Sequence, residues 1–237
     1  MSIANIAAYK FIQLTKLPFL RENLESCCYR LAIKGTILLA KEGINLMLAG
    51  EQTNIESLVE YLQADERFFD LRFKWSVSKQ IPFKKLRVRI KDEIIALKHA
   101  NIDAVKAPVP YISASELKAY LDEKCDFLLL DTRNNYEVSM GSFTNAVDLN
   151  IANFREFPQA CQQIAPHYKA KPVVTFCTGG IRCEKAAIML KSQGFDQVMQ
   201  LQDGILQYFS EYGGAHFRGD CFVFDERLTV DTNLAHK

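Results

Sequence analysis

The sequence predicts two domains of different architecture: an α+β domain of the ferredoxin-like (acylphosphatase-like) kind, followed by an α/β domain with a parallel sheet. Residues 5–97 read as βαββαβ with one extra strand, the order of a two-layer sandwich. Residues 111–213 alternate buried strands with helices, as parallel sheets do. Pro108 and Pro110 stiffen the stretch between them. We therefore expect domains at 1–98 and 111–213, a linker at 99–110, and a C-terminal extension at 214–237.

Composition narrows the class of protein. The chain has 237 residues, of which 49% are hydrophobic and 24% charged, with a net charge of +1, so a disordered chain is excluded. Seven cysteines form no even framework and no Cys-x-x-Cys pair, and the four histidines are scattered. No apolar run approaches the ~20 residues that span a bilayer. We expect a cytoplasmic protein with no metal site and no membrane segment.

The N-terminal elements follow from hydrophobic periodicity and turn residues. A hairpin is expected where two apolar runs flank Lys41-Glu42-Gly43, because glycine permits a positive φ. The pattern Thr53-x-x-Glu56 predicts a capping box at the start of a helix. The predicted elements are a strand at 5–14, a helix at 18–33, a hairpin at 35–49, a helix at 53–64, and strands at 71–77 and 86–97.

Charge is concentrated in this half. Residues 72–98 hold nine basic and two acidic residues, a net charge of +7, while the remainder of the chain carries −6. In a strand, alternate residues share a face, so basic side chains would line one side while Leu86, Val88 and Ile90 face the core. The nucleic-acid-binding candidates are Lys84, Lys85, Arg87, Arg89 and Lys91, with Trp75 and Phe83 nearby to stack on bases. A solvated edge of the sheet, protected by lysines, is the equally open alternative.

The second half predicts a parallel sheet whose ligands bind beyond the carboxyl ends of its strands. Ser113-x-x-Glu116 caps a helix, Phe127–Asp131 is a buried strand, and Pro172–Phe176 is another. This last strand runs directly into a glycine-rich turn and then a helix rich in alanine, leucine and methionine. The turn therefore lies where the fold places its ligands.

Cys177 heads that turn and is the predicted catalytic residue. Consecutive backbone N–H groups and the positive end of the helix dipole would surround its sulfur, which stabilises a thiolate or persulfide and lowers its pKa. The expected cradle is Thr178, Gly179, Gly180, Ile181, Arg182 and Cys183. Arg182 completes Cys-x4-Arg, a ring suited to a single sulfur or oxygen atom. Burial of Cys177 as a small hydrophobe is the alternative, and Cys183 either resolves an oxidised Cys177 or fills space.

These motifs resemble known families. Leu130-Asp131-x-Arg133-x3-Glu137-x3-Gly141, the turn at Cys177 and Leu201-Gln-Asp-Gly-Ile205 resemble a rhodanese domain. Nearly the whole chain is similar to the bacterial rhodanese-containing tRNA wobble-uridine hydroxylases. The segments that carry this similarity are Lys41-Glu-Gly-Ile-Asn45, Pro82-Phe-Lys-Lys-Leu-Arg-Val-Arg-Ile-Lys91, Cys177-Thr-Gly-Gly-Ile-Arg-Cys-Glu-Lys-Ala186 and Gly219-Asp-Cys-Phe-Val-Phe-Asp-Glu-Arg227.

The resemblance implies oxygen-dependent conversion of the tRNA wobble uridine to 5-hydroxyuridine, with Cys177 essential. It implies the tRNA anticodon arm as partner and dioxygen as cosubstrate, and leaves the electron donor unidentified. The chain shows no dinucleotide fingerprint and no compact iron triad, so we expect no other cofactor, and no obligate protein partner is evident. Many relatives continue into a cysteine-rich tail, whereas this chain stops ten residues after Arg227. A persulfide-forming sulfurtransferase and a non-catalytic RNA-binding adaptor are the alternatives.

Overall fold

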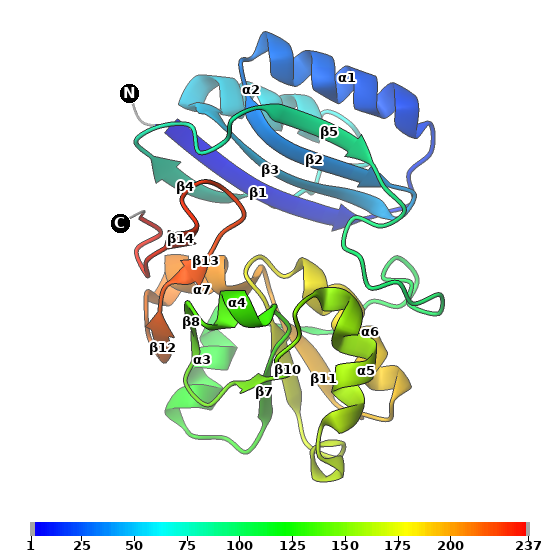
Figure 1. Cartoon of the computed structure of the whole chain (residues 1–237), viewed down its shortest axis with the longest axis vertical. Coiled ribbons are helices and arrows are strands. Elements are labelled where there is room, and N and C mark those ends of the chain that lie inside the picture. The colour runs from blue at the N-terminus through cyan, green and yellow to red at the C-terminus, as the bar shows by residue number, and fades with distance from the viewer. Residues whose placement is uncertain (1–2, 236–237) are drawn as a thin grey trace. The chain divides into compact units, whose positions relative to one another are not determined.

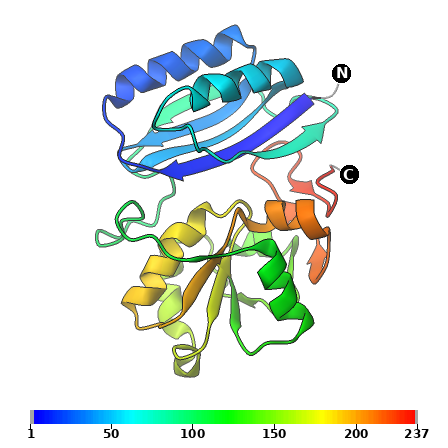
Figure 2. The same ribbon diagram turned by 180° about the vertical axis from the view of Figure 1, so that it is seen from behind.

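The chain forms two compact units in the computed structural model, which describes residues 3–235 (Figures 1 and 2). The first unit holds residues 3–95 together with 224–228. The second holds 96–223 and 229–235. The N-terminal unit therefore takes five residues from near the C-terminus. Both predicted fold classes are confirmed.

The N-terminal unit is a five-stranded sheet with two helices over one of its faces (Figures 1 and 2). The strands lie in the order β4-β1-β3-β2-β5, and β5 is the extra strand, parallel to β2 at the edge. Its core is formed by apolar residues of the sheet and both helices, such as Ile6, Leu24, Leu46 and Leu58. The elements are β1 (Ile3–Phe11), α1 (Leu17–Arg30), β2 (Lys34–Ala40), β3 (Gly43–Glu51), α2 (Gln52–Gln63), β4 (Lys74–Ser78) and β5 (Leu86–Ile90).

The predicted capping box at Thr53 is wrong. The helix already begins at Gln52 with Glu51 as its N-cap, and no side chain caps it. Thr53 lies inside the first turn, where its carbonyl oxygen accepts a hydrogen bond from Ser57 at 2.9 Å. The tight β3–α2 connection leaves no room for a cap two residues later.

Strand boundaries also differ from those predicted. The strand expected at 86–97 ends at Ile90 because its partner β2 ends at Ala40, and the chain beyond it is irregular. Ile90 is 38% exposed and does not join the core, in contrast to Leu86 and Val88. The first strand is shifted to Ile3–Phe11, and β4 begins only at Lys74.

The second unit is built on a parallel sheet in the order β6-β11-β10-β7-β9. The capping box of Ser113 and Glu116 is confirmed at the start of α3. Its sheet and main helices are β6 (Tyr111–Ile112), α3 (Ala114–Asp122), β7 (Leu128–Asp131), α4 (Asn135–Val138), β9 (Val147–Asp148), α5 (Phe157–Ala160), β10 (Val173–Phe176), α6 (Ile181–Ser192), β11 (Val198–Leu201) and α7 (Gly204–Tyr212).

Short elements complete this unit. Two small antiparallel pairs join β12 (Phe217–Gly219) to β8 (Gly141–Phe143) and β13 (Cys221–Phe222) to β14 (Thr229–Val230). Three 3-10 turns lie at Phe154–Glu156, Cys161–Gln163 and Pro166–Tyr168. Within residues 3–235, no helix has the length and apolar character needed to cross a membrane.

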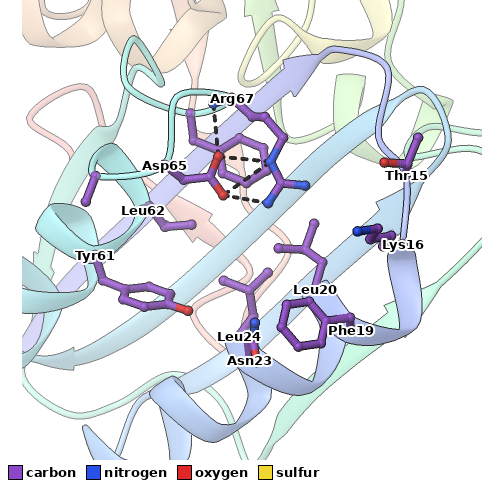
Figure 3. Close-up of a pocket in the computed structure, with 12 residues that line it drawn as sticks. Thr15, Lys16, Phe19, Leu20, Asn23, Leu24, Tyr61, Leu62, Asp65 and Arg67 are labelled. Carbon is purple, nitrogen blue, oxygen red and sulfur yellow. Dashed lines mark hydrogen bonds and ion pairs between the residues drawn. The ribbon is translucent and has the colours of Figure 1, made fainter.

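A pocket of about 420 Å³ opens in the N-terminal unit beside α1 and α2 (Figure 3). Its floor is apolar and includes Leu20, Leu24 and Leu62, and the ion pair of Asp65 and Arg67 lies at its edge. This concavity belongs to a different unit from Cys177.

Candidate active site

Cys177 follows β10, which lies between β7 and β11 in the parallel sheet, and so stands at the carboxyl end of a central strand. The chain then turns through Gly179 and Gly180. Gly180 is the N-cap of α6 and has a φ of +95°. Such a backbone conformation is cheap for glycine alone. The turn therefore aims the start of α6 at the Cys177 sulfur.

The start of helix α7 supports this turn from one side. Backbone N–H groups of Ile205 and Leu206, at the start of α7, donate to the carbonyl oxygens of Cys177 at 3.0 Å and Thr178 at 3.1 Å. Gly204 makes this possible: with φ at +70°, a Cβ there would lie 2.5 Å from the Cys177 carbonyl oxygen and 2.7 Å from the Gly180 nitrogen. By contrast, a Cβ on Gly179 would meet no described atom within 4 Å. The turn is packed tightly toward α7 and is open at Gly179.

Several donors converge on the buried sulfur of Cys177. The Gly180 N–H lies 3.1 Å from it, and it also accepts hydrogen bonds from the backbone and guanidinium of Arg182 and from the Cys183 thiol. Burial by itself raises the pKa of Cys177. The Cys183 hydrogen bond, the charge of Arg182 and the backbone N–H groups outweigh it and lower that pKa below the ordinary value of 9.0. The site therefore holds a thiolate at neutral pH.

Arg182 is itself fixed by a buried carboxylate. Its two terminal nitrogens donate to Glu137 at 2.5 and 2.7 Å, and both side chains are almost fully buried. Glu137 lies on α4 and also accepts the backbone N–H of Asn134 at 3.1 Å. Burial would lower the pKa of Arg182, but the charge and hydrogen bonds of Glu137 raise it, so the guanidinium stays charged beside the sulfur. Sequence reasoning missed this role of Glu137, although Asn134-x-x-Glu137 is a capping pattern.

Cys183 lies on the first turn of α6, is fully buried and interacts with Cys177. Burial raises the pKa of Cys183 well above 9.0, and the hydrogen bond to Cys177 raises it further. The Thr132 hydroxyl lies 3.7 Å from the Cys183 sulfur and donates to the Phe176 carbonyl at 2.9 Å. Cys183 is thus the protonated partner of a thiol–thiolate pair.

The remaining loop side chains point elsewhere. The Thr178 hydroxyl donates to the Phe222 carbonyl at 3.3 Å and lies 4.0 Å from the Cys221 sulfur, so it ties the turn to β13. Ile181 is half-buried and contributes its backbone to the first turn of α6. Of the six residues expected around the sulfur, Gly180, Arg182 and Cys183 donate to it.

A buried ion pair supports the neighbouring loop after β7. Arg133 donates to both Asp131 oxygens, at 2.9 and 2.6 Å, and to the Gly141 carbonyl at 2.7 Å. The Ser142 hydroxyl donates to the same carboxylate at 2.7 Å. Because a buried pair is costly to break, these contacts hold the loop that carries Thr132.

The basic candidates lie on β5 and in the segments just before and after it. All five are exposed, and Lys84 forms an ion pair with Glu226 at 3.6 Å. The sheet register places Arg87 beside Thr36 and Arg89 beside Leu38, on the face away from the core shared with α1 and α2. Lys91 lies just beyond the strand, where its N–H still donates to the Leu39 carbonyl at 2.8 Å.

Two further residues lie on the same face of the sheet, and one of them, Lys74, is only 9% exposed. Register pairs across β2, β3 and β1 connect Arg87 to Lys74 on β4, and Tyr9 of β1 lies on the same side. The Lys74 ammonium is 4.7 Å from the centre of the Tyr9 ring. Trp75 is paired with Ile6 and therefore points to the other face. Strand alternation in β1 and β4 is the signal that identifies Lys74 and Tyr9.

Comparison with known proteins agrees with this division. Residues 3–94 match the model of the UPF0176 acylphosphatase-like domain, and residues 113–211 match that of the rhodanese-like domain. A tRNA uridine(34) hydroxylase of Thiobacillus denitrificans is 49% identical over 99% of this chain and 96% of its own length. Proteins of the same name from Cupriavidus necator and Bordetella avium are 47% and 48% identical over 99% of this chain, and over 85% and 99% of their own lengths.

Proposed function

Because this chain belongs to the family of tRNA uridine(34) hydroxylases, we propose that it hydroxylates uridine 34 of tRNA at C5, with dioxygen as oxygen source and Cys177 as nucleophile. The observation that carries the residue assignment is the convergence of Gly180, Arg182 and Cys183 on one buried sulfur. Since tRNA is the substrate, we expect the enzyme to act in the cytoplasm.

The proposed chemistry begins with addition of the Cys177 thiolate to C6 of the uridine. The sulfur–carbon bond pushes charge toward the C4 carbonyl oxygen, and C5 becomes an enolate carbon that reacts with dioxygen. The Gly180 N–H and the Arg182 guanidinium, which stabilise charge on the sulfur, are placed to stabilise the departing thiolate as well. The uridine must leave the anticodon stack before the thiolate can reach its C6.

The open face of the N-terminal sheet is the proposed tRNA-binding surface. Arg87 and Arg89, which are both exposed, supply positive charge for phosphates, and Tyr9, half-buried on the same face, supplies a ring for an unpaired base. Proteins can bind single-stranded RNA with basic side chains that lie beside an aromatic ring on the face of a sheet.

The function is tested with Cys177→Ser on the full chain and unmodified tRNA. We expect no 5-hydroxyuridine by nucleoside mass spectrometry, with tRNA affinity unchanged, because serine keeps the shape but is not ionised at neutral pH. Cys161→Ser is the matched control, since Cys161 is buried in the same unit and bonds to the Pro158 carbonyl. Normal product from Cys177→Ser would refute the assignment.

The RNA surface is tested separately with Arg87→Ala. We expect weaker tRNA binding, and a decrease of about 0.7–0.9 in the slope of log affinity against log salt if one phosphate contact is lost. Arg21→Ala, an exposed arginine on α1 of the same unit, is the control and should leave the slope unchanged. Equal effects of the two substitutions would refute the surface.

A sulfurtransferase is the second candidate, because donors that converge on a single sulfur would equally stabilise a persulfide on Cys177. Incubation with thiosulfate and cyanide discriminates between the two. Thiocyanate formation that depends on Cys177, in a preparation that makes no 5-hydroxyuridine, would favour this candidate.

A further inference from the structure

The two cysteines of the candidate active site could supply the electrons that the proposed hydroxylation requires. Hydroxylation of a carbon by dioxygen places one oxygen atom in the product and reduces the other to water, which requires two electrons from a donor. Two thiols that become a disulfide release two electrons. The Thr132 hydroxyl lies 3.7 Å from the Cys183 sulfur and donates to the carbonyl of Phe176, the residue before Cys177, so the two buried thiols are neighbours, and each shifts the pKa of the other.

We propose that Cys177 and Cys183 supply the two electrons of each turnover themselves and leave it as a disulfide. This inference rests on the proposed function and adds its reductant. A thiol of the solution then reduces the disulfide for the next turnover.

The steps balance with these two side chains. After Cys177 has added to C6, C5 forms a bond to dioxygen, and the Cys183 thiol protonates the resulting peroxide. The Cys183 thiolate attacks the distal oxygen, so that the O–O bond breaks, Cys183 becomes a sulfenic acid, and C5 keeps an alkoxide oxygen that takes a proton from solvent to become a hydroxyl group. Loss of the C5 proton and of the Cys177 thiolate then releases 5-hydroxyuridine.

The last step closes the disulfide. The freed Cys177 thiolate attacks the Cys183 sulfur and expels water. The sum is uridine, dioxygen and two thiols giving 5-hydroxyuridine, water and one disulfide.

Three structural features favour this role for Cys183 over simple filling of space. Its sulfur is fully buried and interacts with Cys177, and an oxygen on C5 of the adduct would be three bonds from the Cys177 sulfur. Thr132 orients it at 3.7 Å through a hydroxyl that is itself bonded to the backbone. Burial also shields a sulfenic acid from over-oxidation by small oxidants. A residue that only filled space, such as alanine, would have no sulfur for Thr132 to orient or for burial to protect.

The test is a single-turnover experiment. The full chain is reduced, freed of reductant without oxygen, mixed with unmodified tRNA and exposed to air. We expect up to one 5-hydroxyuridine per chain, loss of two thiols, and a peptide crosslink between Cys177 and Cys183 by mass spectrometry. The same protein in air without tRNA should keep its thiols over that time, and added dithiothreitol should permit many turnovers.

Cys183→Ala separates the role from the proposed function. Without reductant we expect at least tenfold less product than from wild type, and added dithiothreitol should restore part of it, since an external thiol can reduce the peroxide. Cys161→Ala is the matched control and should match wild type. Thermal unfolding of each variant checks that it is folded, and thiol counting on wild type gives a result that needs no variant.

Two outcomes would overturn the inference while leaving the proposed function intact. One is a single-turnover yield from Cys183→Ala equal to wild type. The other is wild-type product that forms only with dithiothreitol present, or without any thiol loss. A chain that makes no 5-hydroxyuridine under any of these conditions would instead refute the proposed function.

Discussion

Arg182 connects a buried carboxylate to the reactive sulfur. Its guanidinium is held by Glu137 and contributes both charge and a hydrogen bond to Cys177. Glu137 fixes the position of the guanidinium and keeps it charged beside the Cys177 sulfur. The positive charge beside Cys177 thus depends on a residue of a different element, α4.

Glu137→Gln should reduce the stability of the chain by roughly 3–5 kcal/mol, because it removes the carboxylate of a buried ion pair. Asp126→Asn is the matched control, since Asp126 pairs with Lys171 at 2.7 Å but is 75% exposed, and it should cost at most ~1 kcal/mol. Urea unfolding followed by circular dichroism measures both. Equal losses would show that the buried pair has no special weight.

The lowered pKa of Cys177 predicts an unusual titration. Since the folded protein favours the thiolate, one thiolate per chain should persist as pH falls well below 9.0, where an ordinary thiol is protonated. Ultraviolet absorbance of the thiolate follows it, with Cys177→Ser as the baseline. Cys183→Ala should shift the transition upward, because it removes one hydrogen-bond donor. A midpoint at or above 9.0 in wild type would contradict the site geometry.

At the scale of elements, the ends of neighbouring strands position the site. The turn after β11 supports the turn after β10 through backbone hydrogen bonds that exist only because Gly204 lacks a side chain. Gly204 should therefore not tolerate a side chain, whereas Gly179, whose Cβ would enter open space, should.

Gly204→Ala should destabilise the chain by about 1–3 kcal/mol and displace the turn at Cys177, because its Cβ would meet backbone atoms and its φ is positive. Gly179→Ala should stay within ~0.5 kcal/mol of wild type, since its Cβ enters open space. Thermal unfolding compares them. A Gly179→Ala variant that is the less stable of the two would contradict this packing.

The same scale shows what the sequence can and cannot predict. The strand, glycine turn and helix around Cys177 were recognisable because each depends on a continuous stretch. The contact of Arg182 with Glu137 joins residues 45 positions apart, so no local pattern reveals it. The error at Thr53 has a related cause. The capping pattern is present in the sequence, but the helix begins at Gln52, directly after β3 ends at Glu51.

For the whole molecule, the segment 224–228 makes the N-terminal unit discontinuous in sequence. Arg227 donates to the Ser76 hydroxyl at 3.0 Å and to both oxygens of Asp225, at 2.9 and 2.6 Å, and it is nearly buried. The Glu226 N–H donates to the Pro82 carbonyl at 3.0 Å. Five residues from the far end of the chain thus complete the β4–β5 region.

Arg227→Ala should lower the stability of the N-terminal unit by about 1–3 kcal/mol, because it leaves the buried Asp225 carboxylate without its cation. Trp75, the single tryptophan of the chain, lies on β4 and reports this unit by fluorescence during urea unfolding. Glu226→Ala, whose side chain is exposed, should change the midpoint little. No difference between the two variants would contradict the role of the segment.

The discontinuity also limits how such a protein can be rearranged. A gene cut anywhere in residues 99–110 gives a first fragment that lacks five residues of its own fold, and a second fragment that carries them. Exchange of the rhodanese-like unit for another would therefore remove part of the N-terminal unit as well. Recombination can transfer the two units together, or it can exchange the rhodanese-like unit while residues 224–228 stay with the N-terminal unit. It cannot exchange either unit as one continuous stretch of sequence.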